Sequence, residues 1–280
     1  MGGLDTYDYG ARGYYPAIGR FTTIDPLAEK YYNISPYAYV ANRFMTAIDI
    51  NGEWIYFRDE YNGTQYRYDR DNKAWQQQIE GKWVTYTAEA GSNEEKMLNG
   101  LNKLSKYTTG EQMIDFFSND KNNIAFVNGD KAREASGNFV VINLSKNEKT
   151  MTEIGLQESP LFVTIGHEMA HKEQSISGVA SADERWFSYT TPSGEREKVT
   201  KGEQYATHIE NQLRADASLP LRTHYLSTTK QVPLGTGGAK ISISVGYNDS
   251  ALLKDNGKSK FYGTDYRFEA LTRTIFRSVR

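Results

Sequence analysis

The sequence predicts an α+β protein, with a short β-rich segment at the N-terminus and a larger domain that contains two amphipathic helices. Three observations predict this fold class. Residues 1–52 are rich in Tyr, Gly and Pro and show no helical period, which is typical of short strands and tight turns. Residues 53–90 continue with short β-like runs. Residues 160–176 and 200–215 then repeat apolar side chains at helical spacing.

Composition places the chain among globular proteins. Its 280 residues are 38% hydrophobic and 24% charged, and this length is enough to bury a core. The 33 basic and 35 acidic residues give a net charge of −2, which argues against a general nucleic-acid binder. The absence of cysteine excludes thiol nucleophiles, disulfides and cysteine-ligated metals.

The sequence lacks the features of a membrane-spanning helix and of a signal peptide. No stretch approaches the roughly 18 apolar residues that a membrane-spanning helix needs. Residues 1–7 lack the basic region and apolar run of a signal peptide. We expect the chain to be the end of a longer protein, secreted or delivered to a target cell by a dedicated secretion system.

The elements between residues 53 and 118 are predicted to be β-hairpins and linking helices. Strands are expected at Trp54–Phe57 and Tyr66–Asp69, with a turn at Asn62-Gly63 between them. A further strand is expected at Trp83–Tyr86. Residues 93–118 have helix-like apolar spacing, interrupted near Gly110.

Residues 119–280 are predicted to form the domain that carries the chemistry. It begins with an apolar run at Ala125–Val127 and with the clearest strand of the chain, Asn138–Leu144, which is β-branched and apolar. Two interpretations of that strand stay open. It is either a core strand or the edge of a cleft that pairs with an extended substrate.

A helix is expected from about Pro160 to about Ile176, with Ser159 as its N-cap. It contains His167-Glu168-Met169-Ala170-His171, in which the two histidines lie one turn apart on one face. Two neutral imidazoles placed in this way can share one Zn²⁺, and Glu168 beside them can accept a proton from the attacking water. The alternative is a solvated helix face with two surface histidines.

The third zinc ligand is sought downstream, because a catalytic zinc takes three protein ligands and keeps one open position. The candidates are Glu203, His208, Glu210, Asp216 and His224. In a helix over residues 200–215, Glu203 lies beside the apolar stripe while His208 lies almost opposite. Glu203 is therefore the favoured ligand.

Other roles for these residues remain open. Thr200-x-x-Glu203 is also a capping box, in which Glu203 would only bond the start of the helix. His208 or His224 would then be the ligand. If Glu203 is the ligand, Glu210 can hold a ligand histidine from behind, and Arg214 can neutralise excess carboxylate.

Hydrolysis of a peptide bond also needs a donor for the oxyanion that develops on the carbonyl. Tyr225, His224 and Tyr189 are the candidates, with Tyr225 or His224 favoured. Together these residues predict a catalytic group of Glu168, Tyr225 and His224 next to a metal group of His167, His171 and Glu203.

The N-terminal segment resembles a known family. Its motifs occur in the family's order and span nearly all of residues 4–52: Tyr7–Arg12, Gly19–Thr22, Asp25–Lys30 and Ser35–Tyr39. They resemble the conserved end of the Rhs/YD-repeat core, which implies a β-strand shell around a variable C-terminal toxin. Two departures, Asn42-Arg43-Phe44 and Asp49-Ile50-Asn51-Gly52, bear on the self-cleavage known for some members.

The later motifs resemble a second group of proteins. His167-Glu168-x-x-His171 followed by Glu203-x-x-Ala206 resembles the Glu-ligand zincins, or gluzincins. The fuller run through Glu210, Arg214 and residues 219–225 resembles the NleD-like effector metallopeptidases. This resemblance implies a zincin-like fold, Zn²⁺ held by His167, His171 and Glu203, and Glu168 as general base.

These resemblances imply the zinc-peptidase toxin of an Rhs-type protein. Its expected partners are a protein substrate in the target cell, a cognate immunity protein and the upstream Rhs shell. An inactive binding or structural module and a toxin of another kind, such as a nuclease, are the competing hypotheses. The C-terminal residues Arg267, Arg273, Arg277 and Arg280 are interleaved with acidic ones, which favours a solvated face over nucleic-acid binding.

Overall fold

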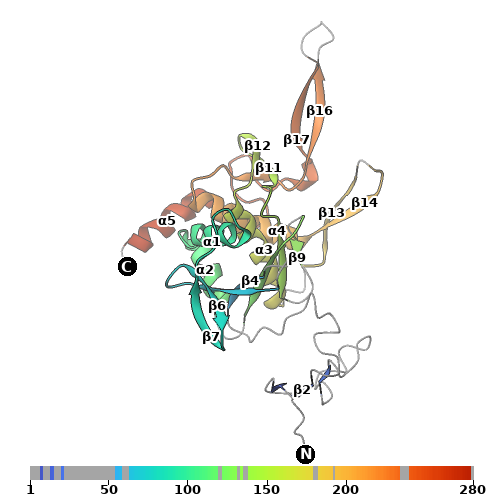
Figure 1. Cartoon of the computed structure of the whole chain (residues 1–280). Coiled ribbons are helices and arrows are strands. Elements are labelled where there is room, and N and C mark those ends of the chain that lie inside the picture. Colours follow the sequence, from blue (N-terminus) through green and yellow to red (C-terminus); the bar gives the residue numbers. More distant parts are fainter. Residues whose placement is uncertain are drawn as a thin grey trace, which may run out of the picture. The chain divides into compact units, whose positions relative to one another are not determined.

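A computed structural model describes most of the chain. It covers residues 54–58, 63–118, 122–130, 138–178, 182–191, 193–233 and 240–278, with short strands at 7–8, 13–15, 20–21 and 133–134. The chain divides into two compact units, Met1–Asn51 and Gly52–Arg280. The second unit combines helices with several sheets, so the predicted α+β fold class is confirmed (Figure 1).

The first unit contains a small antiparallel sheet. Its strands are β1 (Tyr7–Asp8), β2 (Gly13–Tyr15) and β3 (Arg20–Phe21). Tyr14 pairs with Tyr7 on one side and with Phe21 on the other. Short strands are what the Tyr- and Gly-rich sequence predicts. The motifs of residues 25–52 lie outside the described residues.

The second unit is built on a seven-stranded mixed sheet of order β7-β6-β5-β4-β8-β10-β9. Strands β4 to β7 form an antiparallel meander, and β4, β8 and β10 are parallel neighbours. The strands are β4 (Ile55–Arg58), β5 (Gln65–Asp69), β6 (Ala74–Ile79), β7 (Lys82–Tyr86), β8 (Ile124–Asn128), β9 (Arg133–Glu134) and β10 (Phe139–Ile142). One sheet therefore connects the two segments that the sequence analysis divided at residue 118.

Most of these strands match the sequence prediction within a residue or two, but the two-residue β9 and the longer β6 were not predicted. Residues Gln76, Gln77 and Gln78 of β6 are polar, so the run carries a weak strand signal. Trp75 at its start is nevertheless fully buried among the rings of Phe57, Tyr66 and Tyr68. Burial of the Trp75 side chain against the neighbouring strands thus stabilises β6 as a strand.

Strand β10 is a core strand. All four of its residues are buried, and it pairs with β8 on one side and with β9 on the other. Because both of its edges are paired, it cannot add an extended substrate along its length. The core interpretation of residues 138–144 is the one the structure supports.

Helices α1 (Asn93–Leu104), α2 (Thr108–Phe117) and α3 (Leu161–Ile176) pack on the sheet. The core joins alternate sheet residues such as Ile55, Phe57, Phe126 and Val140 to Leu101, Ile114, Phe162, Ile165 and Met169 of the helices. Alternate strand residues share one face of a sheet. The helices therefore cover that face, and α3 is held between the sheet and the rest of the unit.

The interruption predicted near Gly110 lies earlier in the chain. Helix α1 ends at Leu104, and α2 begins at Thr108. Gly110 lies inside α2, where a Cβ would come within 2.2 Å of the Leu104 carbonyl oxygen. The glycine thus serves the close approach of the two helices rather than the break between them.

Helix α4 (Lys201–Asp216) packs directly against α3. A Cβ on Gly166 would lie 2.2 Å from the Cδ1 atom of Leu213, which is itself fully buried. A larger residue at position 166 would therefore force the Leu213 side chain to shift. Gly166 immediately precedes His167, so this tight contact lies next to a candidate ligand.

The remaining strands form smaller sheets around α3 and α4. One sheet has the order β12-β11-β15, and two hairpins, β13–β14 and β16–β17, extend from the unit (Figure 1). Their bounds are β11 (Lys149–Thr152), β12 (Gly155–Glu158), β13 (Arg185–Thr190), β14 (Arg196–Thr200), β15 (Arg222–His224), β16 (Ser227–Pro233) and β17 (Lys240–Gly246).

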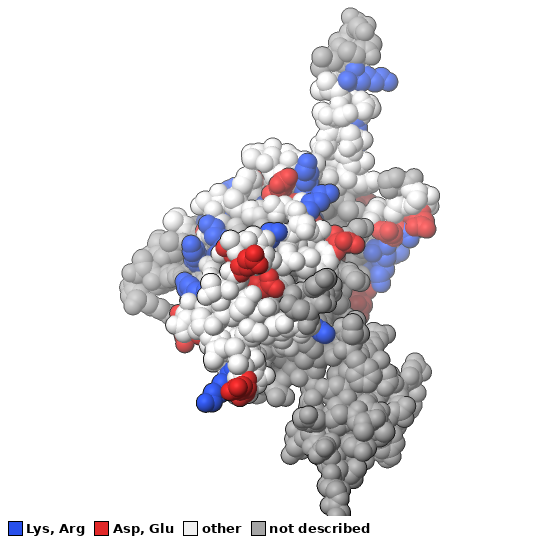
Figure 2. Space-filling view, in the orientation of Figure 1, with Lys and Arg blue, Asp and Glu red and all other residues white. Residues whose placement is uncertain are grey.

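Arg267, Arg273 and Arg277 fall on helix α5 (Tyr266–Ser278), whose Tyr266 and Ala270 are buried against α4 and the loop after it, and Arg280 lies outside the described residues. Arg267 is exposed and pairs with Glu153. On the face shown in Figure 2, basic and acidic side chains are interspersed over the described surface. No helix of the described residues is long and apolar enough to cross a membrane.

Candidate metal centre

Helix α3 presents its two histidines on the side opposite its core face. Phe162, Ile165 and Met169 are buried in the core, whereas His167 and His171 remain partly accessible. This division matches the prediction from helical spacing. The N-cap prediction is wrong: the helix begins one residue later, at Leu161, and Pro160 occupies the cap position without a side-chain bond. Ser159 instead accepts a hydrogen bond from Arg214 at 2.9 Å.

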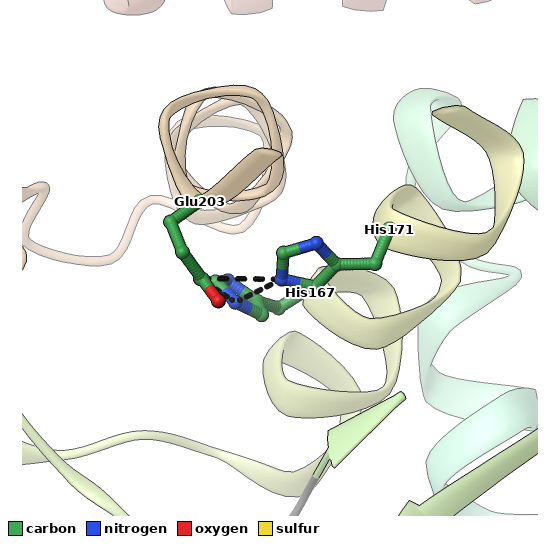
Figure 3. Close-up of side chains that lie close together, drawn as sticks. All are labelled: His167, His171 and Glu203. Atoms are coloured by element: carbon green, nitrogen blue, oxygen red, sulfur yellow. Dashed lines mark hydrogen bonds and ion pairs between the residues drawn. The ribbon is translucent and has the colours of Figure 1, made fainter. Parts of the chain in front are cut away.

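Three side chains converge between α3 and α4, as Figure 3 shows. The Nε2 atoms of His167 and His171 lie 3.3 Å apart. The Oε2 atom of Glu203 lies 3.3 Å from the first and 3.2 Å from the second. These groups could hold a metal ion. The structure thus brings together the three residues for which the sequence predicts a ligand role.

Glu203 does not cap its own helix. Thr200 occupies the N-cap of α4 but makes no side-chain cap bond. Burial alone would raise the pKa of Glu203, but the hydrogen bonds to His167 and His171 outweigh burial and hold the pKa well below its usual range. Glu203 is therefore a carboxylate directed at the two histidines, and the capping-box alternative has no support in the structure.

Glu210 holds His167 from behind. Its Oε2 atom lies 3.1 Å from the Nδ1 atom of His167, so the other ring nitrogen faces His171 and Glu203. The expected contact between Glu210 and a histidine is confirmed. Burial alone would lower the pKa of His167, but the hydrogen bonds to Glu203 and Glu210 raise it to about 10. Such a partner fixes the orientation of the ring.

Two arginines neutralise Glu210, which is 2% exposed. Arg214 Nε donates to its Oε1 atom at 2.8 Å, and Arg222 Nη1 donates to its Oε2 atom at 2.7 Å. Arg214 is also buried, and its Nη2 atom donates to the hydroxyls of Thr150 and Ser159. The network thereby ties α4 to strand β11 and to the start of α3.

Arg222 is the functional residue that sequence reasoning missed. It occurs in the run of residues 219–225 that resembles the effector peptidases, but no spacing rule relates it to Glu210, because the two residues lie on different elements. Folding back of the chain after α4 brings them together. Helical periodicity relates residues of one helix only, so it cannot reveal the contact between Glu210 and Arg222.

The three candidate ligand atoms of His167, His171 and Glu203, which we call the ligand triangle, open into a pocket of about 290 Å³. Its lining comprises Glu148, Thr150, Ser159, Thr164, His167, Glu168, His171, Thr200, Glu203, Glu210, Arg222 and Tyr225. Glu168 is only 6% exposed, and its Oε2 atom is buried without a hydrogen-bond partner. Burial raises the pKa of Glu168. A buried carboxylate oxygen without a hydrogen-bond partner costs free energy of folding. Glu168 therefore does not stabilise the fold at this position.

Tyr225 is the candidate oxyanion donor that lines this pocket. Its pKa is raised, first by burial and then by the nearby negative charge of Glu203. Arg222 Nη2 donates to the Tyr225 carbonyl at 2.8 Å, and the guanidinium lies 5.0 Å from the centre of the Tyr225 ring. The phenol is therefore held protonated beside the ligand triangle.

The pairing of β11 with β15 is irregular beside the pocket. Met151 pairs with His224 and Thr152 with Arg222, so two residues of β11 oppose three of β15. Arg222, the first residue of β15, and Tyr225, which follows its last residue, both line the pocket.

The other predicted candidates lie elsewhere. His224 is not part of the pocket lining; its ring lies against Gly246, and its Nδ1 atom is 3.0 Å from the Thr223 hydroxyl. His208 stacks on Tyr262 and bonds the Tyr266 hydroxyl at 2.9 Å. Tyr189 donates its hydroxyl to Glu197 on the β13–β14 hairpin. The structure therefore gives no support to His224 or Tyr189 as the oxyanion donor, because neither lines the pocket.

Comparison with known proteins finds a family match over this part of the chain. The model of peptidase family M91, described as an effector protein family, matches residues 65–225. That range includes the sheet from β5 onward, both helices that carry the candidate ligands and Tyr225. No curated protein and no solved structure matched the chain. Because the matched range covers more than half of its residues, the chain belongs to the M91 peptidase family of effector proteins.

Proposed function

We propose that this peptidase is a zinc-dependent endopeptidase that acts inside a target cell as the C-terminal toxin of an Rhs-type polymorphic toxin. The observation that carries the proposal is the triangle of His167, His171 and Glu203 with the unpaired Glu168 beside it. Two imidazoles, one carboxylate and an adjacent buried base form the group of residues that hydrolyses a peptide bond in zinc peptidases.

The spacing of the three donor atoms supports zinc. Tetrahedral coordination with bonds of about 2.0–2.1 Å separates neighbouring ligand atoms by roughly 3.3–3.4 Å. The three separations here are 3.2, 3.3 and 3.3 Å. Nitrogen and carboxylate donors also suit Zn²⁺ better than Mg²⁺ or Ca²⁺, which prefer all-oxygen sites. His167, His171 and Glu203 would thus hold the ion.

Glu168 is the general base in this proposal. A zinc ion in this site would act as a Lewis acid, polarising the peptide carbonyl and lowering the pKa of the attacking water. Glu168 accepts one proton from that water and passes it to the amine that leaves when the C–N bond breaks. Its Oε2 atom is free for this transfer because no described group bonds it.

Tyr225 is the proposed donor to the carbonyl oxygen as negative charge develops there. Burial keeps the phenol protonated, and its hydroxyl lies beside Glu203. Arg222 is a positioning residue, since it contacts the backbone carbonyl and the ring face of Tyr225 but is itself committed to Glu210. The donor is thereby fixed before the substrate binds, which is the condition for effective oxyanion stabilisation.

The wider context of the proposal rests on the sequence. The resemblance of residues 4–52 to the end of an Rhs core supports an upstream Rhs shell, delivery to a target cell through a dedicated secretion system and a cognate immunity protein in the producing cell. Membership of an effector family supports a protein substrate in the cell that receives the peptidase.

Metal content tests the proposal most directly. Elemental analysis of the purified chain is expected to find one zinc per molecule, and His171→Ala is expected to lose it. Removal of zinc with a chelator should abolish cleavage of a randomised synthetic peptide library, and added zinc should restore it. His208→Ala is the control, because His208 contacts Tyr262 and Tyr266 instead of the triangle. Full cleavage by metal-free protein would contradict the proposal.

A second prediction concerns the oxyanion donor. Tyr225→Phe removes one hydroxyl but keeps the ring contacts with Trp186 and Phe187. We expect kcat to fall by about 100- to 1,000-fold, as for other oxyanion donors, with little change in KM. Zinc content should stay at the wild-type level. Tyr189→Phe, at the hydroxyl bonded to Glu197, should leave kcat unchanged; equal kcat for both variants would exclude Tyr225 as the donor.

A further inference from the structure

Glu148 stands apart from the other acidic residues of the pocket. It immediately precedes β11, and its carbonyl accepts a hydrogen bond from the Ser159 amide at 2.7 Å. The backbone of Glu148 is therefore fixed between the β11–β12 pair and the start of α3. Its side chain is exposed at the point where it lines the pocket.

Each of the other three carboxylates of the pocket has bonding partners or a proposed catalytic role. Glu203 is bonded to both histidines, Glu210 is neutralised by two arginines, and Glu168 is buried as the proposed base. The Glu148 carboxylate, by contrast, makes no hydrogen bond or ion pair with any described residue. Its charge therefore does not stabilise the fold through any contact with a described residue.

No arginine or lysine among the described pocket residues is available to pair with Glu148. Among the described lining residues, Arg222 is the one arginine and there is no lysine. Its guanidinium is already committed to Glu210 and to the carbonyls of His224 and Tyr225. The exposed rim of the pocket thus carries a negative charge that faces the space where a substrate must lie.

We propose that Glu148 is a specificity-determining residue that binds a lysine or arginine side chain of the protein substrate close to the bond that is cut. The inference rests on the proposed peptidase function and deepens it by naming a feature of the substrate. A basic side chain brought to this rim finds an unpaired carboxylate with no competing partner, and the resulting charge-assisted hydrogen bond forms only in the complex.

The experiment compares cleavage-site profiles of zinc-loaded full-length variants on a randomised synthetic peptide library, read by mass spectrometry. Wild type is expected to enrich Lys and Arg at one position near the cleaved bond. Glu148→Gln should lose this enrichment, with kcat/KM for the preferred basic peptide lowered about tenfold, mainly through KM. Glu148→Lys should shift the enrichment to Asp and Glu at the same position.

Glu158 provides the matched control. It is an exposed acidic residue on β12, in register with Lys149, and it does not line the pocket. Glu158→Gln and Glu158→Lys should keep the wild-type profile if position 148 itself makes the contact. Efficient cleavage with no basic enrichment, or with a profile that Glu148→Lys leaves unchanged, would overturn this inference alone. Absence of cleavage by zinc-loaded wild type would overturn the proposed function as well.

Discussion

Glu168→Gln is expected to lower kcat by about 1,000-fold or more while zinc content and fold stay unchanged. The amide has the size of the carboxylate but cannot accept the proton of the attacking water, and general-base catalysis contributes about 100- to 10,000-fold. Glu168 lies outside the triangle of donor atoms, and its Oε2 atom has no partner to lose. The substitution therefore separates chemistry from metal binding.

The measurement is kcat on a peptide chosen from the library, at equal zinc content by elemental analysis and with matching far-UV circular dichroism. Glu173→Gln is the matched control on the same helix. Glu173 does not line the pocket, so its replacement should leave kcat near the wild-type value. Retention of more than about a tenth of the activity by Glu168→Gln would remove the general-base role.

The largest effect on stability is expected at Glu210. Glu210→Gln keeps the shape of the side chain but removes the charge that neutralises Arg214 and Arg222. Glu210 and Arg214 are each 2% exposed, and breaking a buried pair from one side costs about 3–5 kcal/mol because the remaining charge stays buried. We expect a loss of this size in the free energy of unfolding of the metal-free chain, measured with urea.

A surface pair provides the control for this prediction. Glu184 pairs with Lys201, and both side chains are largely exposed. Glu184→Gln should therefore cost less than about 1 kcal/mol. Zinc affinity gives a second measurement, because loss of the Glu210 contact frees the His167 ring and should weaken binding about 10- to 100-fold. Similar unfolding free energies for the two variants would show that the Glu210 network does not support the fold.

Local sequence patterns were enough to find the two helices and their faces. The spacing of Ile165 and Met169 against His167 and His171 reports which side of α3 meets the core, since it depends only on helical geometry. The direction of Glu203 followed in the same way from the apolar stripe of α4. These predictions succeeded because each concerns residues within about two turns of one another.

Features that depend on distant parts of the chain were beyond such patterns. The polar strand β6 exists because its neighbours bury Trp75, and Arg222 joins Glu210 because the chain folds back after α4. Tyr225, and not His224, lines the pocket, where the chain has left β15 and strand alternation no longer applies. The local sequence predicts Ser159 as a helix cap, but its hydroxyl accepts a hydrogen bond from the buried Arg214 of α4. In each case tertiary contact overrides local preference.

Substitutions at the rim and in the buried network of this pocket have different structural consequences. Arg214 bonds a helix partner, a strand and the start of another helix, so its exchange disturbs several elements together. The Glu148 side chain makes no such contact with the described residues. A change at the rim can therefore alter what the pocket binds while the buried network stays intact.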